Sequence, residues 1–204
     1  MELSATLILI AVTVGVSLFA MNREEVLDRL VFWPPAVTRR REYQRFLTYG
    51  FVHADAPHLL FNMITLYFFG RAIENLVAAK LGPFGFYIFY LAALVVSILP
   101  SYFKHRDDSR YRSLGASGAV SAVLFAFILV QPWALIFVFF VPMPAILYAV
   151  IYVGYTLWAD RQGRDNINHS AHLWGGAFGV AALLVIEPGT VSHFLRELMN
   201  PRLG

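Results

Sequence analysis

Three polar features interrupt apolar stretches of this sequence, and their residue types are suited to nucleophilic chemistry. Ser117 lies among small residues in "SLGASGAVSAVLFAFILV", and His172 lies in "AHLWGGAFG". His58 and Asn62 are four residues apart in "HADAPHLLFN". A serine hydroxyl attacks a carbonyl carbon when an imidazole takes its proton, and nearby N–H groups stabilise the oxyanion that forms. These residues therefore suggest a nucleophile, a base and two oxyanion donors.

The elements that must position these residues have the composition of a membrane protein. The chain has 204 residues, of which 58% are hydrophobic and 14% charged, and its mean hydropathy is +0.61. A bilayer core about 30 Å thick requires about 20 apolar residues per helix. Stretches near that length occur at about residues 4 to 20, 57 to 79, 84 to 103, 114 to 131, 140 to 159 and 169 to 187. The sequence predicts an all-α, polytopic membrane protein with six transmembrane helices.

The fifth stretch requires a separate interpretation because it contains Pro142 and Pro144. Proline disrupts a helix interior, so we expect a loop at membrane depth before a helix that begins near residue 140. The longest connection, about residues 21 to 57, mixes charges with "LVFWPPAV" and is expected to lie partly in the membrane interface. With a short tail at 188 to 204, residues 1 to 204 are predicted to form one membrane-embedded domain.

The ends and charges of the chain suggest where it resides. The first apolar stretch lacks the basic flank of a signal peptide, so a retained anchor helix is expected, and a bacterial inner (cell) membrane is favoured over an organelle. The chain has no cysteine, which excludes disulfides and thiolate metal sites. Its basic residues occupy short loops between spans, as lipid-facing flanks do, so the bilayer is an expected partner and nucleic acid is not. No cofactor is expected.

Chain parity brings the polar features together. In a six-span protein the second, fourth and sixth helices begin on the same side of the membrane. At about 1.5 Å per residue, Asn62, Ser117 and His172 lie roughly 7.5 to 10 Å beyond the nearest preceding charge. Their depths agree within one helical turn. We therefore expect the serine and the imidazole to meet in the membrane.

Helix packing offers another explanation for part of this pattern. Gly115 and Gly118 belong to a small-residue stripe on the fourth stretch, and Gly175 and Gly179 form a GxxxG motif on the sixth. Polar residues within spans can also serve only as interhelical hydrogen-bond partners. The two roles are compatible, because small residues let two helices approach until a short serine side chain reaches an imidazole.

Other chemistries fit the residues less well. Four histidines, His53, His58, His169 and His172, are a conceivable zinc set, but the chain has no HExxH motif and no carboxylate at a ligand spacing. We therefore expect no metal site. No Asp or Glu lies in a span near the serine, which predicts a dyad and argues against an aspartyl protease.

Together these residues resemble the rhomboid intramembrane serine proteases. The similarity runs from Arg45 to Gly179, with "HADAPHLLFN", "GASG" and "AHLWGGAFG" in family order. The resemblance implies a Ser117 nucleophile, a His172 base, and an oxyanion hole from Asn62, His58 and the Ser117 backbone N–H. It also places the family's first-loop arginine at Arg45.

The resemblance implies hydrolysis of peptide bonds in or near transmembrane segments of other membrane proteins. The fifth helix is then a candidate gate for the substrate. The chain departs from the family pattern at two positions. Gln44 precedes the loop arginine where a tryptophan is common. Ser121 stands one turn after the nucleophile, where many members place a tyrosine against the histidine ring.

The sequence leaves two alternatives to a protease open. A rhomboid-like scaffold would bind client transmembrane helices without cutting them, and a less favoured alternative is a His-based metal-binding membrane protein.

The orientation implied by the resemblance conflicts with the distribution of positive charge. The family usually keeps its N-terminus cytoplasmic and its active site outward. That orientation places twelve of the 16 Lys and Arg residues outside, against the positive-inside rule.

Overall fold

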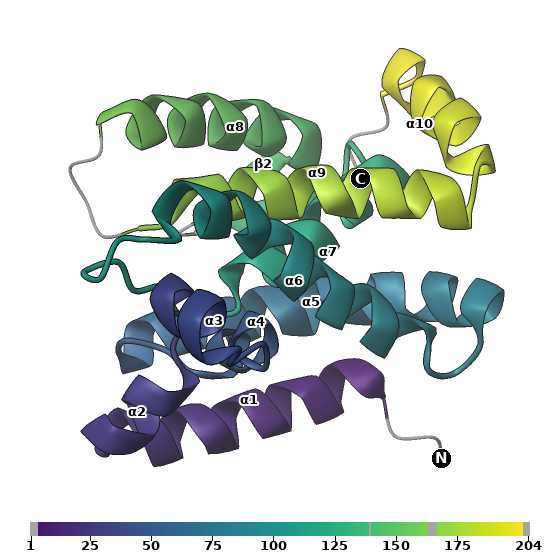
Figure 1. Cartoon of the computed structure of the whole chain (residues 1–204). Helices are drawn as coiled ribbons and strands as arrows, with labels where there is room; N and C mark the ends of the chain where they lie inside the picture. Colours follow the sequence, from purple (N-terminus) through teal and green to yellow (C-terminus); the bar gives the residue numbers. More distant parts are fainter. Residues whose placement is uncertain (1–3, 139, 163–166, 202–204) are drawn as a thin grey trace.

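The computed structural model describes residues 4–138, 140–162 and 167–201 (Figure 1). Long helices dominate the described chain, with a group of short helices between the first two long ones. The helices are α1 (Ala5–Met21), α2 (Glu24–Leu30), α3 (Pro34–Arg40), α4 (Arg45–Thr48), the 3-10 helix η1 (Tyr49–Phe51), α5 (Ala56–Leu81), α6 (Gly85–His105), α7 (Ser117–Val130), α8 (Ala145–Gln162), α9 (His169–Ile186) and α10 (Gly189–Met199).

The six long or apolar helices α1, α5, α6, α7, α8 and α9 correspond to the six predicted stretches. By length and composition, α6 and α9 are the two helices in the described ranges that are long and apolar enough to cross a membrane. Helices α1 and α7 are apolar but have only 17 and 14 residues. The mostly helical architecture agrees with the prediction, whereas the number of spans stays a prediction.

The segment before α8 differs from the expected loop at membrane depth. Strands β1 (Leu135–Val138) and β2 (Val141–Pro144) form an antiparallel hairpin in which Leu135 pairs with Pro144. Both Pro142 and Pro144 lie in β2, and α8 begins at Ala145 rather than near residue 140. Proline is compatible with an edge strand, so the same residues that delay the helix are accommodated in the hairpin.

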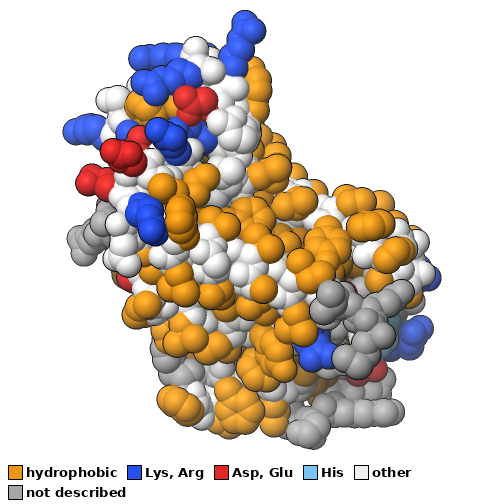
Figure 2. Space-filling view, turned by 90° about the horizontal axis from the view of Figure 1, so that it is seen from below, with side chains coloured by type: hydrophobic (Ala, Val, Ile, Leu, Met, Phe, Trp, Pro, Cys, Tyr) orange, Lys and Arg blue, Asp and Glu red, His pale blue; other side chains and the backbone are white. Residues whose placement is uncertain are grey.

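Apolar side chains cover much of the outer surface. Figure 2 shows hydrophobic side chains across the middle of one face, with many of the charged side chains gathered at one end. On α5, Leu60, Phe61 and Phe68 are more than half exposed. Contiguous apolar surface of this extent marks a membrane or protein contact.

Helix α7 lies at the centre of the bundle and contacts α5, α6, α8, α9 and α10. Its closest crossing is with α9. A Cβ atom on Gly175 would collide with the carbonyl oxygen of Gly118, and one on Gly179 would collide with that of Ala122. The two backbones therefore touch, which only glycine permits at these positions.

The placement of Gly115 on the fourth helix is wrong. Because α7 begins at Ser117, Gly115 lies in the preceding loop, where its φ of 113° favours glycine. A Cβ atom there would lie 2.6 Å from Cε1 of His58, so this glycine also lets the loop approach the His58 ring.

Candidate active site

The first turns of α7 and α9 bring Ser117 and His172 together. Ser117 is the first residue of α7, and His172 lies in the first turn of α9. The Oγ atom of Ser117 is 2.8 Å from Nε2 of His172, and both side chains are half-buried. This is the separation at which an imidazole can accept a serine proton. The close contact of Gly175 and Gly179 of α9 with the backbone of α7 holds the two helices at the separation that this hydrogen bond requires.

A cavity of about 700 Å³ opens onto this pair. His58 and Asn62 from α5 line the same cavity, so the structure brings all four predicted chemical groups to one space. Gly115 and Gly118 also contribute to its wall. The cavity is large enough to hold water and an extended segment of peptide next to the serine.

The side-chain amide of Asn62 is held by its own helix, α5. The Nδ2 atom of Asn62 donates a hydrogen bond of 2.9 Å to the carbonyl oxygen of His58. An amide nitrogen carries two N–H groups, so this bond does not exhaust its capacity to donate. The backbone amides of the first turn of α7 also lack acceptors within the helix, as at any helix N-terminus. These N–H groups are available as hydrogen-bond donors at the cavity that Ser117 lines.

The loop before Ser117 is fixed to the first-loop segment by backbone hydrogen bonds. Phe32 and Ser113 exchange two bonds, 2.9 Å from Phe32 N to Ser113 O and 3.1 Å in the reverse direction. The N–H of Gly115 donates to the carbonyl oxygen of Tyr49 at 2.9 Å. The short helices of the first loop therefore set the entry of the chain into α7.

His53 adds a side-chain bond to this loop. Its Nε2 accepts the N–H of Ala116 at 3.2 Å, so the proton of the neutral ring is on Nδ1, which lies 2.9 Å from Ser17 Oγ. The Ser17 hydroxyl in turn donates to the carbonyl oxygen of Phe51 at 2.9 Å. Burial, with a smaller contribution from His58, lowers the pKa of His53 to about 3. His53 is only 1% exposed, so this loop histidine is buried and not solvated.

Asn168 joins the starts of α7 and α9. Its Oδ1 caps α9 by accepting the N–H of Ala171 at 3.0 Å. Its Nδ2 donates to the Tyr111 hydroxyl at 2.9 Å and to Ser113 Oγ at 3.2 Å. One side chain thus ties the helix that carries the imidazole to the loop that precedes the serine.

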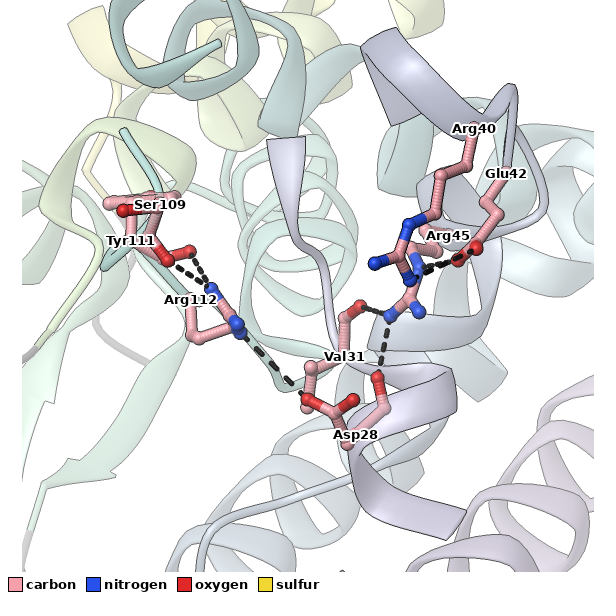
Figure 3. A network of polar contacts seen from close by, with 8 residues as sticks. All are labelled: Asp28, Val31, Arg40, Glu42, Arg45, Ser109, Tyr111 and Arg112. Atoms are coloured by element: carbon pink, nitrogen blue, oxygen red, sulfur yellow. Dashed lines mark hydrogen bonds and ion pairs between the residues drawn. The ribbon is translucent and has the colours of Figure 1, made fainter. Parts of the chain in front are cut away.

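Arg45 organises the first-loop segment itself (Figure 3). It is 3% exposed, and its guanidinium donates to the carbonyl oxygens of Asp28 and Val31, each at 2.7 Å. Its Nε donates to a carboxylate oxygen of Glu42 at 2.5 Å. The guanidinium therefore satisfies backbone groups that have no helical partner, which explains a buried arginine in a loop. Gln44, at the position where the family often has tryptophan, immediately precedes α4.

Arg112 extends this network toward the serine loop. It lies 4.0 Å from a carboxylate oxygen of Asp28 (Figure 3). Its guanidinium carbon is 4.1 Å from the centroid of the Trp33 ring. It also donates to the carbonyl oxygen of Ser109 at 2.8 Å. The network links the first loop to the residues that lead into α7.

The described part of the chain contains no group of three or more His, Cys, Asp or Glu side chains that could hold a metal ion. His53 and His58 contact each other, with ring centroids 4.9 Å apart, as do His169 and His172 at 6.1 Å.

Sequence reasoning did not identify Asn168 or Tyr152 as parts of this site, and it named His53 only as a member of a conceivable zinc set. Tyr152 lies on α8, and its ring centroid is 6.2 Å from that of His172. An Asn immediately before an apolar stretch was a helix-capping signal for Asn168. No sequence feature identified Tyr152, because its contact with the site depends on how α8 packs against the other helices.

Comparison with known proteins agrees with this architecture. Residues 40–188 match the family model described as the Rhomboid domain. The chain is similar to "RHOMBOID-like protein 12, mitochondrial" of Arabidopsis thaliana, with 36% identity over 155 residues, or 70% of this chain and 46% of that protein. It is also similar to "Rhomboid protease GluP" of Bacillus subtilis, with 32% identity over 149 residues, or 72% of this chain and 27% of that protein.

A human relative, "Presenilin-associated rhomboid-like protein, mitochondrial", is 34% identical over 139 residues, which cover 64% of this chain and 34% of that protein. The matched segment thus spans about half or less of each of these relatives. The chain belongs to the rhomboid family, whose members are integral to membranes and include serine proteases.

Proposed function

We propose that this protein is an intramembrane serine endopeptidase that cleaves peptide bonds in or near transmembrane segments of other membrane proteins. The observation that carries the proposal is the 2.8 Å contact between Ser117 Oγ and His172 Nε2 beside a cavity. Membership of a family that includes serine proteases supports it.

In this proposal Ser117 transfers its hydroxyl proton to Nε2 of His172 as Oγ bonds to the carbonyl carbon of the substrate. The oxyanion accepts hydrogen bonds from Asn62, His58 and the backbone N–H of Ser117. The carbon–nitrogen bond then breaks, and the imidazolium returns the proton to the leaving amine. Water attacks the acyl-enzyme by the same route in reverse and releases the serine.

The substrate must present an unwound peptide, because helical backbone is hydrogen-bonded and shielded from attack. Small or helix-breaking residues near the cleaved bond are therefore the expected preference. Water enters from the side of the bundle that carries the first turns of α7 and α9. Helix α8 lies at the edge of the bundle and is the proposed gate for the substrate (Figure 1).

The test is cleavage of a helix-destabilised model transmembrane substrate in detergent. We expect cleavage by the wild-type chain and at least a roughly 1000-fold loss for Ser117→Ala and for His172→Ala, as for other serine dyads and triads. Ser192→Ala is the matched control, because Ser192 is an exposed serine on α10 that bonds only its own helix. Equal cleavage by the wild type and Ser117→Ala would exclude a serine mechanism.

The same assay separates the alternatives. If the wild type binds the substrate helix and never cleaves it, the scaffold is the correct description. If cleavage is insensitive to Ser117→Ala and is abolished by chelators, a metal-dependent activity is correct. Each outcome differs from that of the serine endopeptidase.

Orientation and location are part of the proposal. We infer that the active site faces away from the cytoplasm, as is usual in the family, although most Lys and Arg residues then lie outside. A single cysteine at Ser109 in this Cys-free chain should react with an impermeant reagent from the outer side only. Reaction only from the cytoplasmic side would reverse this orientation. The bacterial inner membrane is a prediction from the sequence alone, and the mitochondrial and chloroplastic names of several relatives do not support it.

A further inference from the structure

The residue one turn after Ser117 contacts a tyrosine from another helix. Ser121 is 5% exposed, and its Oγ lies 3.0 Å from the hydroxyl of Tyr152 on α8. A buried tyrosine hydroxyl needs a hydrogen-bond partner, and a small polar residue at 121 provides both the oxygen and the space. Ser121 and Tyr152 are therefore matched in size and chemistry.

The Tyr152 ring lies against the imidazole of His172. Their centroids are 6.2 Å apart and their planes are inclined by 21°, the geometry of an offset stack. Two further rings hold Tyr152 in turn. Its centroid is 5.7 Å from that of Phe125 on α7 and 5.5 Å from that of Tyr148, one turn earlier on α8. The ring facing the imidazole is thus supported by its hydroxyl and by two aromatic neighbours.

We propose that Tyr152 is a positioning residue for the base, so that α8 supplies the aromatic support that keeps His172 aimed at Ser117. This inference rests on the proposed endopeptidase function. A histidine side chain rotates easily about its second torsion, so the 2.8 Å contact with Ser117 requires the ring plane to be restrained. Tyr152 restrains it from one face.

This support comes from a helix outside the α7–α9 crossing. Helix α8 lies at the outer edge of the bundle beside α9 (Figure 1), and its fully buried side chains are small, namely Ala145, Ala149, Thr156 and Ala159. Displacement of α8 therefore takes the aromatic partner away from His172 while Ser117 and His172 stay on their own helices. The efficiency of the base consequently depends on where α8 lies.

The experiment measures kcat and KM for cleavage of the model substrate by position-152 variants. We expect Tyr152→Leu to lower kcat by about 2- to 10-fold, the range for loss of one aromatic pair, with little change in KM. Tyr152→Phe keeps the stacked ring and should retain kcat within about twofold. Tyr87→Leu is the matched control, because Tyr87 on α6 is also a half-buried tyrosine, and its ring contacts Phe84.

A second readout separates positioning from general loss of folding. The rate at which a fluorophosphonate labels Ser117 should fall in Tyr152→Leu by the same factor as kcat, and should stay near wild type in Tyr87→Leu. Ser121→Ala removes the partner of the Tyr152 hydroxyl and should cause a smaller fall than Tyr152→Leu. Equal losses in the two leucine variants, or full rate in Tyr152→Leu, would overturn the inference. Failure of the proposed function looks different, because the wild type itself would then neither cleave substrate nor react at Ser117.

Discussion

Helices α7 and α9 pack backbone against backbone where they cross, whereas α8 in the same bundle has open space along one face. At the crossing, backbone touches backbone at Gly175 and Gly179, and no side chain separates the two helices at these two positions. On α8, a Cβ atom added to Gly154 would have no neighbour within 4 Å, and Val150 is 65% exposed. Backbone contact leaves no room for adjustment, whereas a helix with open space around its glycine can shift.

The α7–α9 crossing and α8 therefore contribute to the site in different ways. The rigid crossing sets the distance between Ser117 and His172, and the outer helix supplies Tyr152, which restrains the orientation of the imidazole. The distance is thus built into the core, while the orientation depends on a helix at the edge of the bundle. Matched substitutions in the two regions test this contrast.

The largest contrast is expected between two glycines. Gly175→Ala forces α9 away from the carbonyl oxygen of Gly118 and should lower the free energy of unfolding by about 3 kcal/mol, with most cleavage activity lost. Gly154→Ala, on α8, should be neutral or stabilising by up to about 1 kcal/mol, because alanine is the better helix former. Thermal unfolding in detergent measures both. Similar losses in the two variants would show that the regions are equally packed.

A smaller effect is expected at the start of α9. Asn168→Ala removes the helix cap and the bonds to Tyr111 and Ser113, and should cost about 2 kcal/mol. It should also lower kcat, because the start of α9 is no longer tied to the serine loop. Asn200→Ala is the control, since Asn200 is exposed and its side chain donates only to the end of its own helix at Arg196. If both variants behaved alike in unfolding and cleavage, the tie between the helices would have no role.

Two valines sharpen the contrast further. Val123 on α7 is fully buried, and its replacement by alanine should lower the free energy of unfolding by about 1 to 2 kcal/mol through lost packing. Val150→Ala on the exposed side of α8 should change it by less than about 0.5 kcal/mol. The comparison uses one side-chain change in two settings. A larger loss at Val150 than at Val123 would contradict the assignment of α7 to the rigid core.

The smallest effect concerns His53, which extends the rigid region into the first loop. Its pKa falls from an ordinary value of 6.5 to about 3 in the folded chain, so below pH 6.5 the unfolded chain binds a proton that the folded chain does not. Stability should therefore decrease as the pH falls from 6.5 toward 3, with a loss of about 1 kcal/mol by about pH 6 relative to about pH 8. His53→Asn should flatten this decrease in unfolding experiments. An unchanged pH dependence in the variant would place the titrating group elsewhere.

Much of this arrangement was predictable from local sequence. Hydropathy located the helices within a few residues, as for 84 to 103 against Gly85–His105, because each apolar stretch reports on its own surroundings. Parity and equal depth predicted that Ser117 and His172 meet, since both depend only on the order of helices and the rise per residue. The GxxxG motif predicted the close crossing because small residues let two helix backbones approach each other.

The remaining features depend on packing between distant segments. The partner of Ser121 could not be found from its own helix, because Tyr152 approaches it only after α8 docks. Burial of His53 depends on α1, through Ser17, and on the loop before α7. The hairpin before α8 was missed because prolines predict where a helix cannot begin and leave open what the preceding residues form.

The most direct measurement of the central claim is to locate the residue that reacts with a fluorophosphonate in the folded protein. The account predicts one modified residue, Ser117, identified by mass spectrometry, with labelling lost in His172→Ala and after denaturation. The contact of 2.8 Å between the serine oxygen and the imidazole is the reason for this selectivity. Modification of another serine in the wild type, or undiminished labelling of Ser117 in His172→Ala, would contradict it.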